Sequence, residues 1–171
     1  MKTMEAMPHE HAFVNLALET AMRMREMYTL TVDQVNIPGR TISLNKTKNG
    51  DRRQIPMSSV SVSLLQNYMV VHAKEIKSRK GVIFPFWDGK KTAGALAITT
   101  SIVSKKFAAI FKTAGLTNFH FHDLRHESTC RFFLRTKYSD LTIAKITGHR
   151  SMKMLMRYAN LRGFELADGM W

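Results

Sequence analysis

The sequence predicts a mainly α-helical domain that contains a small antiparallel β-sheet. Apolar residues recur at the helical period along most of the chain, and Phe13, Leu16 and Ala17, for example, fall on one face. Asn49-Gly50 stands between two short β-type segments, and this pair favours a hairpin turn because such a turn needs positive φ. The 171 residues, 44% of them hydrophobic, suffice for one domain with a core.

The expected elements follow in chain order. Helices are predicted at residues 9–22, 25–30, 58–74, 99–114, 122–136, 139–147 and 151–160. Residues 41–44 and 54–56 are predicted to be the two strands of the hairpin, with its turn at 46–51. Residues 81–86 are expected to be extended, and Pro85 argues against a central strand there because proline cannot donate to a ladder.

Two further expectations concern helix faces and ends. In the helix at 58–74, the residues expected to face the core are Val60, Leu64, Tyr68 and Val71. Ser151 is expected to cap the last helix, because a serine side chain can accept a hydrogen bond from the first turn.

The charge is the most informative bulk property. Lysine and arginine total 26 against 13 acidic residues, so the formal net charge is +13, which favours a polyanion such as nucleic acid as the partner. The chain has no apolar run of about 18 residues and no signal-peptide pattern, so no membrane span is expected. The single Cys130 is expected to be a small core residue, fits a reducing cytoplasm and leaves no internal disulfide.

The last third of the chain carries a candidate catalytic set. His122-Asp123-Leu124-Arg125, Gly148-His149 and Tyr158 follow one another within about forty residues. An arginine fork can bind two phosphate oxygens, and cations around a phosphate make a tyrosine hydroxyl a useful nucleophile. The order therefore suggests phosphoryl transfer to tyrosine. Each residue alone also has an ordinary structural interpretation, as a cap, a surface ion pair or a core aromatic.

With Arg23 and Lys48 in front of this set, the chain resembles the tyrosine recombinase (phage integrase) family. The likeness covers nearly the whole chain and corresponds to the family's C-terminal catalytic domain, whose fold is therefore expected. It implies an enzyme that cleaves and rejoins DNA through a 3′-phosphotyrosyl bond. The residues that match the family's catalytic pattern, in order, are Arg23, Lys48, His122, Arg125, His149 and Tyr158.

The resemblance also implies a role for each of these residues. Arg23 and Arg125 would clamp the scissile phosphate, and Lys48 would protonate the departing 5′ oxygen. His122 would assist proton transfer, and His149 would donate a hydrogen bond to the phosphate. Tyr158 would attack the phosphorus.

Some positions leave alternatives open. Lys46 competes with Lys48 for the role of the acid, and Arg25 competes with Arg23, although Arg23 has the better spacing to Glu26. Ala21 stands where the family commonly has glycine.

The family likeness implies double-stranded DNA as the partner, dimers or tetramers on that DNA, and accessory DNA-bending proteins. It also implies a cytoplasmic, nucleoid-associated localisation. The basic residues expected to contact DNA are Lys46, Arg52, Arg53, Lys105 and Lys106. No cofactor and no metal is expected, although His120, His122 and His126 lie close in sequence. The alternatives are a type IB topoisomerase and a catalytically silent DNA-binding module.

The domain boundaries expected are a catalytic domain at 1–160 and a C-terminal tail at 161–171. The tail holds four large apolar residues, Phe164, Leu166, Met170 and Trp171, which either fold back on their own domain or dock on a neighbouring subunit. The N-terminal DNA-clamping domain usual in the family is expected to be absent from this chain.

Overall fold

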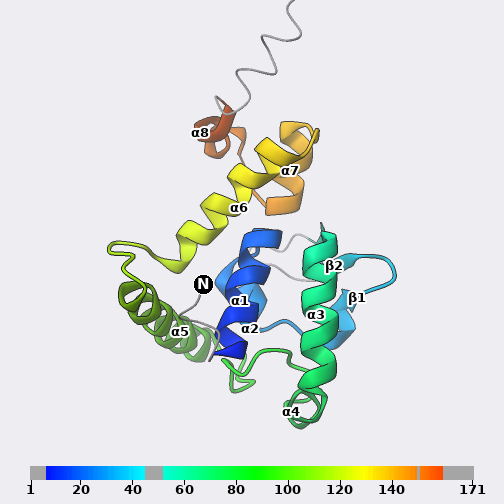
Figure 1. Ribbon diagram of the computed structural model, residues 1–171, viewed down its shortest axis with the longest axis vertical. Coiled ribbons are helices and arrows are strands. Elements are labelled where there is room, and N and C mark those ends of the chain that lie inside the picture. Colours follow the sequence, from blue (N-terminus) through cyan, green and yellow to red (C-terminus); the bar gives the residue numbers. More distant parts are fainter. Residues whose placement is uncertain (1–6, 45–51, 150, 160–171) are drawn as a thin grey trace, which may run out of the picture.

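The computed structural model describes residues 7–44, 52–149 and 151–159. The fold is mainly helical, as the sequence predicts, and its one small sheet lies at one side of the molecule next to α3 (Figure 1). The helices are α1 (Pro8–Thr20), α2 (Met24–Tyr28), α3 (Ser59–Val71), α4 (Ala73–Ser78), α5 (Ala93–Thr113), α6 (Phe121–Arg135), α7 (Asp140–Thr147) and α8 (Met156–Ala159). Two 3₁₀ turns, η2 (Val32–Gln34) and η3 (Met152–Met154), complete the helical elements.

The sheet has three antiparallel strands, one more than the sequence analysis predicts. Strands β2 (Thr41–Leu44) and β3 (Arg53–Pro56) form the expected pair, with Ile42 opposite Ile55. The extra strand β1 (Val35–Asn36) pairs with β2, and at two residues it is too short for an alternating pattern to be visible. The predicted turn at 46–51 lies outside the described residues.

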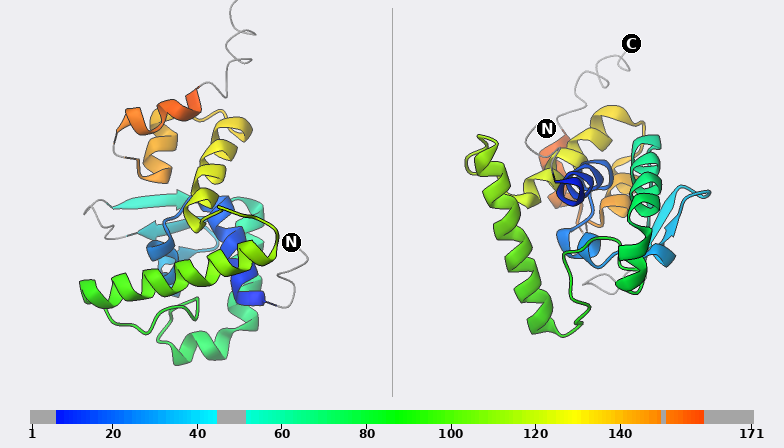
Figure 2. Two further views of the ribbon diagram at one scale, coloured as in Figure 1. Left: turned by 90° about the vertical axis from the view of Figure 1, so that its left-hand side faces the viewer. Right: turned by 60° about the horizontal axis from the view of Figure 1, so that its bottom comes forward.

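Helix α1 is central to the core. It packs against α3 and α6, and α5 lies on the side of α1 away from α3 (Figures 1 and 2). Phe13 of α1 is fully buried at the centre of an aromatic cluster, and its ring centroid lies 5.0–5.3 Å from those of four other phenylalanines, Phe84, Phe86, Phe107 and Phe121. Burial of a phenylalanine typically contributes about 1.5–3 kcal/mol, so this cluster fixes α1 and α6 relative to each other.

A second, smaller cluster joins the C-terminal helices. Phe133, Ile143, Leu155 and Tyr158 pack together where α6, α7 and α8 meet. Cys130 is only partly buried at the edge of this cluster, instead of inside the core. The tyrosine of the candidate site is therefore held by its own small core.

The expected inward face of α3 is partly wrong. Val60 and Val71 are 58% and 73% exposed, whereas Leu65 is fully buried and Tyr68 is 6% exposed. The helix turns its Leu65–Tyr68 face toward α1, and a run rich in valine and serine does not mark that face in the sequence.

Two of the predicted helices also differ from expectation. Helix α5 begins at Ala93, six residues earlier than predicted, because the Thr92 side chain accepts a hydrogen bond from the Ala95 amide and caps it. The predicted last helix, 151–160, is instead η3 followed by α8. Residues 81–86 contain a bridge between Val82 and Thr31 and no strand, which agrees with the argument from Pro85 against a central strand.

Helix α5 is the one described helix with the length and apolar composition that crossing a membrane requires. The core helix of a globular protein passes the same test. In this chain α5 packs Val103, Phe107, Ile110 and Phe111 into the main core, and it carries three lysines.

Candidate active site

The turn between α1 and α2 begins the site. Ala21 ends α1 in the left-handed region with φ of 52°, which explains why glycine suits this position. Its carbonyl oxygen accepts a hydrogen bond from Nη1 of Arg125, 104 residues later in the chain. The turn also places Arg23 at the N-cap of α2. A backbone conformation in the first fifth of the chain thus positions an arginine of the last third.

Arg125 is a buried cation. It lies on α6 and is 5% exposed, and its Nη2 lies 3.5 Å from Nε2 of His149. Burial, followed by the nearby cations Arg23 and Arg53, lowers the pKa of the Arg125 guanidinium well below its usual range, to about 10, and Glu26 opposes that shift. The side chain therefore stays charged at pH 7, and within the described part of the chain no carboxylate forms an ion pair with it.

Glu26 organises the other two arginines. Its Oε1 accepts a bond from Nη1 of Arg23 at 3.0 Å, and its Oε2 accepts one from Nη2 of Arg53 at 2.7 Å. Oε2 also accepts a bond from the backbone amide of Arg23 at 2.8 Å. One carboxylate therefore serves two cations, and with Arg125 this region holds three arginines against one glutamate.

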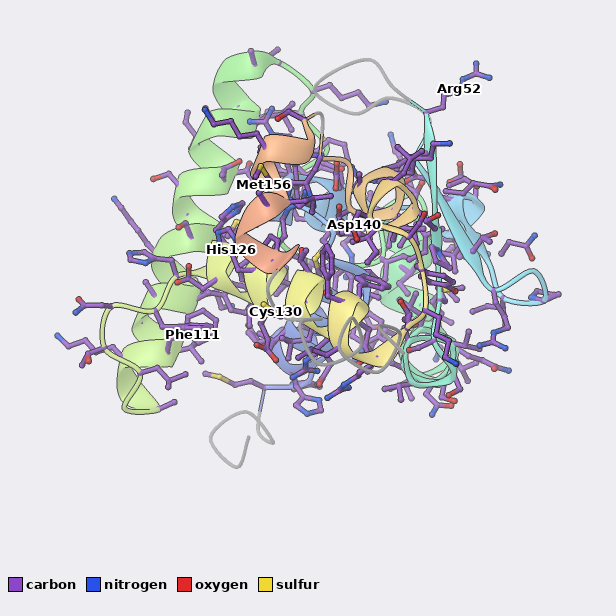
Figure 3. The ribbon with its side chains drawn as sticks, turned by 90° about the horizontal axis from the view of Figure 1, so that it is seen from above. Arg52, Phe111, His126, Cys130, Asp140 and Met156 are labelled. Carbon is purple, nitrogen blue, oxygen red and sulfur yellow. The ribbon has the colours of Figure 1, made fainter. Side chains whose placement is uncertain are left out.

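Arg53 is expected on the DNA-facing surface, but its side chain is 8% exposed and lies inside the site. Burial lowers the pKa of its guanidinium, and the adjacent Glu26 works against that shift. Sequence reasoning groups Arg53 with its neighbour Arg52 because both are basic. In a strand, neighbouring side chains point to opposite faces, so only one of them can face outward. Arg52 is the exposed one and extends away from the body of the molecule (Figure 3).

The Gly148-His149 turn closes over these arginines. Gly148 ends α7 with φ of 75°, and its carbonyl oxygen accepts a 2.8 Å hydrogen bond from Nη2 of Arg23. A Cβ at Gly148 would lie 2.2 Å from Nη1 of Arg53, so both the backbone conformation and the close approach favour glycine. Thr147 Oγ1 lies 2.7 Å from Nδ1 of His149 and orients the ring toward Arg125.

His122 lines a pocket of about 240 Å³ between α2, α5 and α6. Arg23 and Arg125 line the same pocket, so three of the predicted residues share one cavity. Burial lowers the pKa of His122 below 6.5, and the neighbouring His126 and Arg125 lower it further. His122 is therefore held neutral at pH 7.

Tyr158 lies on α8, and its ring is 4% exposed and stacks on Phe133 at a centroid distance of 5.8 Å. Its hydroxyl oxygen lies 2.5 Å from Nδ1 of His126. His126 appears in the sequence analysis only as a rejected metal ligand. Because His126 directly follows Arg125 in α6, its side chain points to a different side of the helix, where it contacts Tyr158. The sequence signal for His126 is therefore its position next to Arg125.

The structure brings Arg23, Arg125, His149 and His122 together, with Tyr158 beside them on α8. Lys48 and Lys46 lie outside the described residues. Lys105 is exposed on α5, whereas Lys106 forms an ion pair with the buried Glu10 and lies 5.2 Å from the centre of the Phe86 ring. Glu26, like His126, is a residue of the site to which sequence reasoning assigns no role. Its side chain accepts a hydrogen bond from the Arg23 amide at the start of α2.

Among the described residues, no three histidine, cysteine or acidic side chains are grouped so that they could hold an ion. His122 and His126 contact each other edge to face at 4.9 Å, and His120 pairs with Asp123 in the first turn of α6.

Comparison with known proteins places this geometry in a family. The model of the phage integrase family matches residues 1–163. The chain belongs to the phage integrase family. A shufflon-specific DNA recombinase of Escherichia coli is 33% identical over 158 residues, which are 92% of this chain and 36% of that protein. A putative integrase/recombinase of Haemophilus influenzae is 32% identical over 84% of this chain and 41% of its own length.

Solved structures show the same fold. XerA recombinase superposes with a TM-score of 0.71 at 18% identity, over 98% of this chain and 60% of that one. The catalytic domain of bacteriophage HP1 integrase superposes with a TM-score of 0.61 at 23% identity, over 93% of this chain and 80% of that one. The chain spans about two fifths of the length of the two curated relatives from Escherichia coli and Haemophilus influenzae.

Proposed function

We propose that this chain is the catalytic domain of a site-specific DNA recombinase that works through a 3′-phosphotyrosyl intermediate. The observation that carries the proposal is the buried cationic site beside a tyrosine. Arg125 is 5% exposed without a carboxylate partner among the described residues, and Arg23 lines the same pocket. A buried positive excess favours an anion of matching shape, and a phosphodiester fits two arginine forks.

The proposed reaction combines these positions with the roles that the family resemblance implies. Arg23, Arg125 and His149 bind the non-bridging oxygens of the scissile phosphate and stabilise the charge that develops on them. Tyr158 attacks the phosphorus, the P–O5′ bond breaks, and Lys48 protonates the departing 5′ oxygen. The energy of the phosphodiester is kept in the tyrosyl ester, so rejoining uses the same groups in reverse.

The relatives support DNA as the substrate. The E. coli relative is a DNA recombinase, and a solved relative, XerH, superposes with a TM-score of 0.64 in a complex with its difH substrate. The net charge of +13 on this chain agrees with such a partner. Arg52 and Lys105 are exposed and remain the described candidates for backbone contacts, together with Lys46 outside the described residues.

The test is covalent capture. In nicked duplexes with a randomised centre, cleavage releases the short fragment between the cleaved bond and the nick, which carries the new 5′ hydroxyl. Rejoining is then blocked and the DNA-linked chain accumulates. Wild type should form an adduct, Tyr158→Phe should form none, and Tyr138→Phe, at a 41% exposed tyrosine, should match wild type. An adduct whose DNA-linked peptide lacks Tyr158 would overturn the assignment.

The acid has its own test. Lys48→Ala should cleave ordinary DNA slowly and recover on a duplex whose bridging 5′ oxygen is sulfur, because a thiolate leaves without a proton. Lys46→Ala is the matched control and should show no such selective recovery. The reverse pattern would move the role to Lys46.

The same experiments address the alternative of a type IB topoisomerase. A recombinase should exchange strands between two captured sites, whereas a topoisomerase should relax supercoils without exchange. Assembly into dimers or tetramers on DNA, help from DNA-bending proteins, and docking of the 161–171 tail on a neighbouring subunit belong to this proposal. Deletion of 163–171 should then weaken assembly on paired sites more than single-site cleavage.

A further inference from the structure

The hydroxyl of Tyr158 has a partner that the proposed mechanism leaves unused. Nδ1 of His126 lies 2.5 Å from the phenolic oxygen, within the range of a strong hydrogen bond. Phe133 stacks on the Tyr158 ring, at an interplanar angle of 21°, and restricts its rotation. The contact therefore joins His126 to a tyrosine whose ring is held in place.

Helix α6 carries phosphate-binding and tyrosine-binding side chains on two different sides. Arg125 points toward Ala21 and His149 and belongs to the phosphate-binding group. His126, the next residue, points toward α8 and Tyr158, close to the start of that helix at Met156 (Figure 3). One turn earlier, His122 contacts the His126 ring edge to face and lines the pocket that also contains Arg23 and Arg125. The row Tyr158, His126, His122 thus runs from the nucleophile to the phosphate pocket.

The chemistry of the attack needs a proton acceptor at this place. A phenol has a pKa of about 10, so it is protonated at neutral pH and must lose its proton as the new bond forms. Tyr158 is 4% exposed, which leaves bulk water little access to take that proton. An unprotonated imidazole nitrogen accepts a hydrogen bond, and histidine is the side chain most often used as a general base.

We propose that His126 is the general base for Tyr158, an inference that rests on the proposed recombinase function. In the step, the phenolic proton moves to Nδ1 of His126 while the Tyr158 oxygen forms its bond to phosphorus. The P–O5′ bond breaks, and the 5′ oxygen takes its proton from Lys48. His126 gains one proton and the leaving group gains one. During rejoining His126 returns its proton to the phenolic oxygen.

Two variants separate proton transfer from hydrogen bonding and from packing. His126→Asn places an amide at the position of Nδ1, so it can hold the Tyr158 hydroxyl but cannot take its proton. His126→Phe keeps a ring of similar size and loses both functions. Both variants should form the covalent adduct more slowly than wild type, by about 10²-fold to 10⁴-fold, the usual contribution of general acid–base catalysis. Their melting temperatures report whether the fold is intact.

Rescue by a more acidic nucleophile is the decisive measurement. A fluorinated tyrosine introduced at position 158 has a lower phenol pKa, so it is ionised without a base. It should restore adduct formation by His126→Asn relative to wild type, whereas a bridging 5′ sulfur should not. Lys48→Ala should show the opposite pattern, with rescue by the sulfur and none by the fluorinated tyrosine.

The outcomes distinguish this inference from the proposed function. His126→Asn at the wild-type rate would show that a hydrogen bond alone suffices and would overturn the role of base. Loss of rate without fluorotyrosine rescue would also overturn it, because the base would then lie elsewhere. In either case a wild-type adduct at Tyr158 leaves the proposed function standing. Failure of wild type to form any adduct on the randomised nicked duplexes would overturn both.

Discussion

Removal of the Glu26 carboxylate should destabilise the chain far more than removal of an exposed carboxylate. Glu26 and Arg53 form a 2.7 Å ion pair with side chains that are 9% and 8% exposed. In Glu26→Ala, Arg53 becomes a buried cation without its partner, and such a change typically costs about 3–5 kcal/mol. The bonds from Glu26 to the Arg23 side chain and amide are lost as well.

The size of this effect is large for a domain. Native domains are stable by about 5–15 kcal/mol, so the loss is a substantial fraction of the total. At about 2–4 °C per kcal/mol for a chain of this length, the melting temperature should fall by roughly 6–20 °C. Urea unfolding followed by circular dichroism gives the free energy directly.

The matched control is Glu127→Ala. Glu127 pairs with Arg131 at 2.8 Å on the surface of α6, where the side chains are 50% and 30% exposed. An exposed pair contributes about 0–1 kcal/mol, so this variant should melt close to wild type. The double variant Glu26→Leu with Arg53→Met should recover stability relative to Glu26→Ala, because it removes both buried charges. Equal losses for Glu26→Ala and Glu127→Ala would refute the reasoning.

Three further predictions come from single positions. Gly148→Ala should lower the free energy of unfolding in urea more than Gly115→Ala does. Both glycines have positive φ, but only at Gly148 would the new Cβ lie close to Arg53. Equal effects would contradict the importance of that close approach. Since the pKa of His122 is lowered in the folded chain, the unfolded chain binds more protons below pH 6.5, and stability should fall as pH falls from 7 to 5. His122→Asn should lessen that fall, and an unchanged pH dependence of the urea midpoint would count against the burial of His122. Ser128→Ala should cost less stability than Ser61→Ala. Ser128 Oγ is buried without a partner among the described residues, whereas Ser61 Oγ donates to Ser58 O at 3.0 Å. A larger loss of stability at Ser128 would show that its hydroxyl has a partner.

The sequence alone predicted the helical class, the β2–β3 hairpin and the family. Those results rest on local information: apolar period, turn chemistry and the order of a few motif residues. The helix from Pro8 to Thr20 and the helix from Phe121 to Arg135 agree with the predicted ranges within two residues. Strand β1 was not predicted, because its two residues carry no strand pattern of their own and form a strand only by pairing with β2.

Only the tertiary structure decided which charged residues work together. Arg52 and Arg53 are equivalent in composition, yet one is exposed on the surface and the other is buried against Glu26, 27 residues earlier in the chain. His126 likewise contacts Tyr158, 32 residues later in the chain, because α8 packs against α6. Sequence motifs determine which groups are available for chemistry. Burial and distance, which depend on packing between remote segments, determine which of those groups share a charge, a proton or a phosphate.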